Sequence, residues 1–266
     1  APRRMNGRRP SRAGFAGHLR VTGLALYLAF ASTPGPAAEL PAGFASLRDV
    51  APDIRQDMRY ATANNFTGRP LPGYDAGECV LKRAVAAALA RVQADLAREG
   101  LTLKVYDCYR PMRAVRAMAR WAADSKAAPD TSRFYPGLDK RKLFALGYIS
   151  STSAHARGVA VDLTLVPRDA AVPPPFDPAA RYGSCAGPAA ARAPDDGLDM
   201  GTGYDCFSAK SASRDESIGA EARANRRRLL AAMARHGFSN YRREWWHFSY
   251  PAADTRQVYD FPISAK

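Results

Sequence analysis

A carboxylate interrupts one of the most apolar stretches of the chain. Asp162 lies within Val159–Val166, whose other residues are aliphatic or threonine. This composition predicts a strand, on which side chains alternate between two faces. One face then carries Asp162 with Ala160 and Thr164, and the core face carries Val159, Val161, Leu163 and Leu165. A lone buried carboxylate is costly or shifts its pKa, so the fold must compensate Asp162, and a metal ion supplies such compensation.

Two of the four histidines stand in motifs that can complete a metal site. His155 belongs to the run Ser153–Asp162, and His247 ends the run Glu244-Trp-Trp-His247. Two histidines and one aspartate form the three-ligand set of a catalytic zinc ion, which keeps a fourth position for water. A carboxylate that is not a ligand can then carry the proton of that water, and Glu244 is the candidate. Taken alone, each motif fits a packed histidine or a surface acid better than a metal site, and the metal site rests on the two motifs together.

The spacing of Glu244 and His247 sets a further condition. Residues three apart on a regular strand face opposite sides, so Glu244 must lie at a bend or a strand end. Arg110 follows a predicted strand and precedes Pro111, a residue suited to the first turn of a helix. It can project from that junction into a cleft and stabilise an oxyanion. Ser153 can bind a polar end of a substrate, and Asp205 can bind an ammonium group.

The pattern of the chain predicts alternating helices and strands. The stretch 57–68 reads as a short strand that runs into a loop, and Tyr60 within it suits either ordinary packing or a pocket wall. The segment 167–196 is rich in proline and alanine and reads as an irregular insert, or lid. The apolar spacing predicts helices over 83–99, 111–126 and 220–236, and strands over 101–106, 159–166 and 238–250, with 258–263 as a further edge. One domain over 39–266 accounts for these elements.

The first 38 residues have the order of a cleaved export signal. Six arginines and no acid precede and flank an apolar run over 21–32, and small residues follow, up to Ala38. The run is shorter than an ordinary membrane span, so we expect no stable membrane insertion after cleavage and an exported, periplasmic location. An uncleaved tail is the alternative.

Without these arginines, 33 basic and 25 acidic residues leave a charge of +8. This suits anionic surroundings, but no nucleic-acid-binding module is recognisable.

The four cysteines predict disulfide bonds. An even count in an exported chain favours pairing, and four cysteines allow three connectivities. Cys79–Cys108 and Cys185–Cys206 are favoured because each pair lies within one segment of the chain. A cysteine zinc site is disfavoured because no Cys-x-x-Cys spacing is present.

Five ordered motifs together resemble the D-alanyl-D-alanine dipeptidases, the VanX-type zinc peptidases. They are Tyr60–Gly68, Tyr109–Pro111, Ser153–Asp162, Met200–Asp205 and Glu244–His247. The resemblance, which runs from about residue 57 to 261, implies an α+β fold of one domain, with a central, mainly antiparallel sheet and flanking helices. It implies one zinc ion bound by His155, Asp162 and His247, with Glu244 as general base and acid and Arg110 stabilising the tetrahedral intermediate. It also places Tyr60, Ser153 and Asp205 around the substrate, with Asp205 near its free amine.

The resemblance implies hydrolysis of the small dipeptide D-Ala-D-Ala, which releases D-alanine during cell-wall turnover. The insert at 167–196 departs from the pattern, and the leader favours recycling of wall peptides over antibiotic resistance. Two other functions stay open. One is a zinc D,D- or L,D-carboxypeptidase that trims peptidoglycan stems, and the other is a non-catalytic wall-binding module. The retained Glu244 and the complete ligand set disfavour the latter, and the sequence predicts no oligomeric state.

Overall fold

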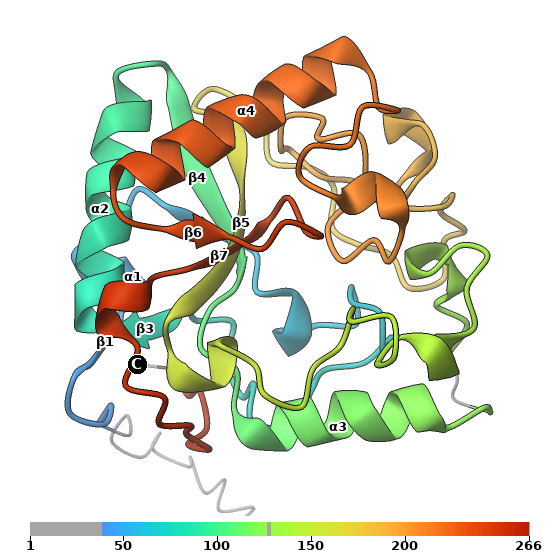
Figure 1. The fold of residues 1–266 in the computed structure, drawn as a ribbon, viewed down its shortest axis with the longest axis horizontal. Helices are drawn as coiled ribbons and strands as arrows, with labels where there is room; N and C mark the ends of the chain where they lie inside the picture. The colour runs from blue at the N-terminus through green and yellow to red at the C-terminus, as the bar shows by residue number, and fades with distance from the viewer. Residues whose placement is uncertain (1–38, 127–128, 266) are drawn as a thin grey trace, which may run out of the picture. The chain divides into compact units, whose positions relative to one another are not determined.

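A five-stranded sheet forms the centre of the structure, a computed structural model that describes residues 39–126 and 129–265. Its strand order is β2-β4-β5-β7-β6, in which β2 runs parallel to β4 and the other neighbours are antiparallel (Figure 1). The strands are β2 (Arg55–Gln56), β4 (Leu101–Asp107), β5 (Ala160–Pro167), β7 (His247–Ser249) and β6 (Ser239–Asn240). A separate antiparallel pair joins β1 (Phe44–Ser46) and β3 (Val80–Lys82). The expected α+β class with a mainly antiparallel sheet is confirmed.

Two helices pack on the core side of this sheet. Helix α2 (Arg83–Ala97) contacts β4, and α4 (Ala220–Arg235) contacts both α2 and β5 (Figure 1). The apolar stripe of α2 is fully buried and consists of Val85, Leu89, Val92 and Leu96. It shares one cluster with Leu229 and Met233 of α4 and with the core-facing residues of β5. Gly100 ends the α2 region at φ +73°, a conformation that costs glycine no steric strain.

The third long helix belongs to a second, aromatic cluster. Helix α3 (Met112–Ala123) buries Met118 and Trp121 among the rings of Tyr60, Phe66, Tyr109 and Phe207. It lies apart from α2 and α4, on the opposite side of the molecule from α4 in Figure 1. A short helix, α1 (Leu47–Val50), buries Leu47 in the first cluster. Helix α3, which was expected over 111–126, ends earlier than predicted, at Ala123.

A bulge in β4 changes which side chains face the site. The pairing of β4 with β5 is regular from Leu101 to Val105, and then Asp107, instead of Tyr106, stands opposite Asp162. An extra residue in one strand bends that strand and re-aims its side chains. The bulge therefore brings a second buried carboxylate beside Asp162.

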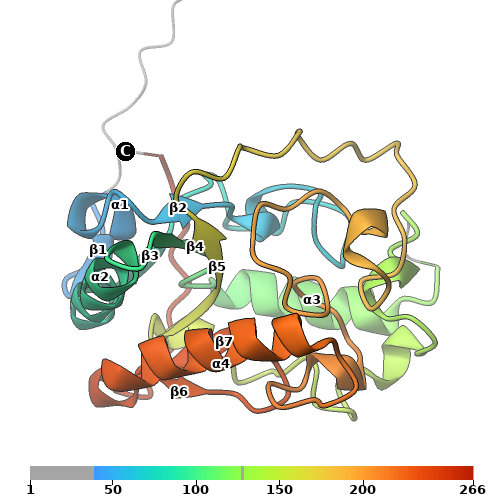
Figure 2. The same ribbon diagram turned by 90° about the horizontal axis from the view of Figure 1, so that it is seen from above.

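The insert after β5 contains one short 3-10 turn, Ala189–Ala191, and otherwise irregular chain (Figure 2). Two attachments fix its far end. The disulfide Cys185–Cys206 joins it to the loop before α4, and Asp195 and Asp196 bind Lys104 of β4. The disulfide Cys79–Cys108 is also present. The irregular insert and both predicted disulfides are confirmed.

Two predicted strands are wrong, and one prediction lies outside the described residues. Residues 258–263 form no edge strand, because only Ile263 pairs, as an isolated bridge to Tyr74. The short strand expected at the start of 57–68 lies earlier, as β2 at 55–56, and a 3-10 turn, Arg59–Ala61, follows it, because Tyr60 packs among rings instead of in a sheet. The export signal at 1–38 lies outside the described residues. Within 39–126 and 129–265, no helix is long and apolar enough to cross a membrane.

Candidate active site and metal centre

Three side chains far apart in sequence meet in one place. The Nε2 atom of His155 lies 3.1 Å from Nδ1 of His247 and 3.2 Å from Oδ1 of Asp162, and that oxygen lies 3.0 Å from the same His247 nitrogen. The three atoms form a nearly equilateral triangle. His155 and Asp162 are almost fully buried, whereas His247 is partly accessible. The predicted ligand set thus converges, open on one side.

Local structure explains this convergence. Asp162 pairs directly with His247 across β5 and β7, so both side chains leave the same face of the sheet. His155 comes from a single 3-10 turn, His155–Arg157, just before β5. Gly158 ends that turn at φ +70°, where a Cβ atom would lie 2.4 Å from the ring of Phe44. Only glycine lets the chain turn so sharply from His155 into β5.

The donor set fits a divalent metal ion. Nδ1 of His155 lies 2.7 Å from the carbonyl oxygen of Cys108, which only accepts hydrogen bonds, so Nδ1 carries the proton and Nε2 presents a lone pair. Ligand distances of 2.0–2.2 Å in a tetrahedral zinc site place neighbouring ligand atoms roughly 3.3–3.6 Å apart. The triangle of 3.0–3.2 Å edges is close to this spacing. One cation would satisfy all three atoms.

Side chains outside the triangle contact its three residues and orient them. They were not among the predicted site residues. The hydroxyl of Tyr204 donates to Oδ2 of Asp162 at 3.0 Å. Asp107, fully buried, has an oxygen 3.3 Å from Nδ1 of His155 and accepts from Tyr74. Such outer partners fix the orientation of metal ligands. Asp107, like Asp162, is a carboxylate on a hydrophobic strand, and Tyr204 lies within the motif Met200–Asp205, so both left a signal in the sequence.

Glu244 lies at the bend that its spacing required. It belongs to the turn between β6 and β7, where its N–H donates to Tyr241 and its carbonyl accepts from the N–H of His247. Its Oε2 lies 4.0 Å from Nδ1 of His247, so it is adjacent to the triangle without belonging to it. Burial, and then the charges of Asp162 and Asp205, raise the pKa of Glu244 well above its ordinary value. A raised pKa makes this carboxylate a stronger base than a glutamate in water.

Arg110 is held rigidly at the same cavity. Its Nε and Nη2 atoms donate to Oδ2 of Asp107 at 2.9 and 2.6 Å. Its guanidinium carbon lies 4.9 Å from the centre of the Tyr60 ring, and Nη2 lies 3.8 Å from Asp162. Burial disfavours its charge, but Asp107 and the other acidic groups around it together outweigh that effect, and the pKa of Arg110 is raised well above its ordinary value. The cavity therefore contains a fixed positive charge.

Asp205 and Tyr60 form a second polar group in the cavity. The Tyr60 hydroxyl donates to Oδ2 of Asp205 at 2.8 Å. Asp205 has a left-handed φ of 55°, which is unusual for a residue other than glycine and recurs at functional sites. Burial, and then repulsion from Asp162, raise the pKa of Asp205 to about 8. Ser153 is also buried, and its Oγ accepts from the N–H of His155 at 3.2 Å.

All eight predicted site residues line one cavity of about 300 Å³. They are Tyr60, Arg110, Ser153, His155, Asp162, Asp205, Glu244 and His247. This volume is at the lower end of the usual range for ligand sites. A metal site, a neighbouring proton carrier, a fixed cation and a buried carboxylate can together serve hydrolysis of a small, zwitterionic amide.

Comparison with known proteins agrees with this geometry. The peptidase M15 family, described as D-ala-D-ala dipeptidase, matches residues 41–173 and 192–264. The chain is 35% identical over 224 residues to the D-alanyl-D-alanine dipeptidase of Streptomyces coelicolor, an alignment that covers 83% of this chain and 98% of that protein. It is 32% identical over 225 residues to the D-alanyl-D-alanine dipeptidase of Enterococcus faecalis, covering 84% and 98%, and 29% identical to that of Escherichia coli, covering 77% and 82%. The chain is therefore a peptidase and belongs to the D-Ala-D-Ala dipeptidase family.

Proposed function

We propose that this protein hydrolyses the free dipeptide D-Ala-D-Ala to D-alanine with one bound zinc ion. The observation that carries the proposal is the triangle of His155, Asp162 and His247 inside a cavity of about 300 Å³ that Glu244, Arg110 and Asp205 also line. The names of the matched relatives support the same substrate. A cavity this small favours a short peptide over a polymer.

Zinc is the proposed metal because two imidazoles and one carboxylate match its preferred donors. When bound, zinc polarises a carbonyl group and lowers the pKa of a water molecule to about 7. His155, Asp162 and His247 would hold it. Their outer contacts, the Cys108 carbonyl and the Tyr204 hydroxyl, keep the ligand atoms aimed before the metal arrives.

The remaining residues divide the catalytic work. Glu244 takes the proton of the attacking water and returns it to the departing amine. Arg110 faces the oxygen on which negative charge develops, and its two hydrogen bonds to Asp107 prevent reorganisation during the reaction. Asp205, supported by Tyr60, receives the ammonium group of the dipeptide, whose charge favours the ionised carboxylate. Ser153 binds a polar group of the substrate.

A comparison of substrates tests the proposal. Purified enzyme is given D-Ala-D-Ala and, separately, a pentapeptide stem that ends in the same two residues, with and without a chelator. We expect release of D-alanine from the dipeptide, loss of activity with the chelator, and recovery with one zinc ion per chain. Turnover of the stem alone would instead establish the carboxypeptidase, and turnover of neither by the zinc-loaded protein would leave the wall-binding module.

We further propose an exported, periplasmic location, in which the enzyme recycles wall-derived dipeptide. Two disulfides, Cys79–Cys108 and Cys185–Cys206, support an oxidising compartment. Cell fractionation with mass spectrometry of the mature N-terminus tests this. Cleavage near Ala38 and recovery from the periplasm are expected, whereas an intact N-terminus in the cytosolic fraction would refute export.

A further inference from the structure

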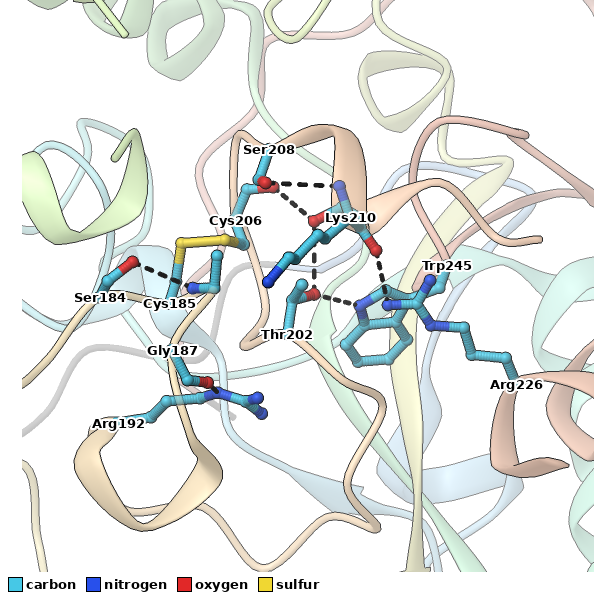
Figure 3. Close-up of a disulfide and its surroundings, with 12 residues drawn as sticks. Ser184, Cys185, Gly187, Arg192, Thr202, Cys206, Ser208, Lys210, Arg226 and Trp245 are labelled. Carbon is cyan, nitrogen blue, oxygen red and sulfur yellow. Dashed lines mark hydrogen bonds between the residues drawn. A yellow bond between two sulfur atoms is a disulfide. The ribbon is translucent and has the colours of Figure 1, made fainter. Parts of the chain in front are cut away.

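A second cavity, of about 330 Å³, lies under the insert. It shares no lining residue with the active-site cavity. One of its walls comes from β4 and β5, through Tyr106 and Thr164, and another comes from the loop that carries Tyr204. Figure 3 shows Thr202, Trp245 and Arg192 of this lining around the disulfide Cys185–Cys206. The volume lies within the range of ligand sites.

Part of this cavity lies outside the residues that match the family. The family match stops at residue 173 and resumes at residue 192. The intervening segment contributes Gly183, Cys185, Ala189 and Ala190 to the lining. The peptidase reaction of the family therefore gives no account of the cavity, and the disulfide Cys185–Cys206 ties its wall in place.

Arg133 is the exceptional side chain of the lining. Aromatic rings surround its guanidinium carbon, with centroids at 4.5 Å for Phe134, 5.0 Å for Phe176 and 5.5 Å for Tyr182. Its Nη2 donates to Oδ1 of Asn64 at 3.2 Å. Within residues 39–126 and 129–265, Arg133 forms no ion pair with a carboxylate. Its half-buried cation therefore lacks an anionic partner.

The other two arginines of the lining are already neutralised. Arg59 donates to Asp57 at 2.7 Å and to Asp195 at 2.6 Å, and Arg192 donates to Asp199 at 2.8 Å. The cavity lining thus carries three guanidinium groups and two carboxylates. The surplus positive charge resides on Arg133.

We propose that this second cavity binds a small organic carboxylate through Arg133. A guanidinium fork matches a carboxylate with two parallel hydrogen bonds, and stacked rings hold it in one orientation. The rings of Tyr106, Phe134 and Trp245 also line the cavity and can pack against an apolar ligand body. A purely structural role, in which Arg133 only anchors the insert through Phe176 and Tyr182, is the competing explanation. The proposal does not depend on the reaction in the other cavity.

The probe is 4-bromobenzoate, a carboxylate on an aromatic body, titrated calorimetrically into the full zinc-loaded chain. Three proteins are compared, namely wild type, Arg133→Gln and Arg181→Gln. Arg181 lies exposed on the same insert and does not line the cavity, so its variant controls for the lost charge. We expect wild type and Arg181→Gln to bind alike, and Arg133→Gln to bind roughly 10- to 100-fold more weakly at this site.

Two further measurements keep the test decisive. Crystals soaked in the probe should show anomalous bromine density beside Arg133, a result that does not depend on whether Arg133→Gln folds. Inorganic phosphate should compete poorly, because it lacks the apolar body. Equal binding by Arg133→Gln, bromine density only at the active site, or binding of phosphate without binding of the probe would each overturn the proposal.

Discussion

The substitution Glu244→Gln separates metal binding from proton transfer. Glutamine keeps the size of the side chain and removes its ability to accept a proton. Oε2 of Glu244 lies 4.0 Å from Nδ1 of His247, well beyond the 2.0–2.2 Å of a zinc ligand. All three proposed ligand atoms remain, so we expect one metal ion per chain. The fold should persist, because the Glu244 backbone makes the hydrogen bonds of the turn.

The expected loss of activity follows from the role of the carboxyl. General acid–base catalysis contributes about 10²- to 10⁴-fold, which is roughly 3–5 kcal/mol of transition-state free energy. We therefore expect kcat for D-Ala-D-Ala to fall by at least about 100-fold, with a small change in KM. The assay measures released D-alanine, with metal content determined by atomic emission on the same samples.

A matched control is Glu216→Gln, since Glu216 is exposed and lies outside the cavity. It should retain full activity. Activity of Glu244→Gln within tenfold of wild type, at normal metal content, would remove Glu244 from the proposed mechanism. Loss of the metal together with activity would show that Glu244 acts as a ligand, against the geometry.

Three further predictions concern contacts outside the active-site cavity. Tyr204→Phe removes the hydroxyl bonded to Asp162, so zinc affinity should fall roughly 10- to 100-fold in a chelator competition; unchanged affinity would refute its orienting role. Arg226 is buried and donates to three backbone carbonyls, so Arg226→Met should lose at least about 3 kcal/mol in urea unfolding, and a loss under 1 kcal/mol would contradict this. Burial raises the pKa of Asp195, but Arg59 and a neighbouring lysine outweigh it and lower that pKa below 3.8. Its contribution to stability is therefore complete above pH 3.8 and declines as pH falls further. Acid unfolding curves of Asp195→Asn should lack this component, and an unchanged curve would refute it.

The elements with a strong local pattern could be predicted from sequence. The α2 stripe, the Asp162 strand and the α4 helix all follow from periodicity, because each has one face that must be buried. The bend at Glu244 followed from spacing alone. The edge strand predicted over 258–263 does not form, since an apolar extended segment can pack by its side chains and make a single bridge without joining a sheet.

The active site also depends partly on local sequence pattern and partly on tertiary contacts. The sequence determined which groups must meet, because a carboxylate in an apolar strand needs a partner and histidines are scarce. Only the tertiary structure decided how they are held. Contacts between distant segments create three of its features. These are the bulge that aims Asp107, the hydrogen bond from the Tyr204 hydroxyl to Asp162, and the position of Arg133 in a second cavity. Local propensity specifies the faces of an element, but the partner of each face is chosen by packing, which no short stretch of sequence encodes.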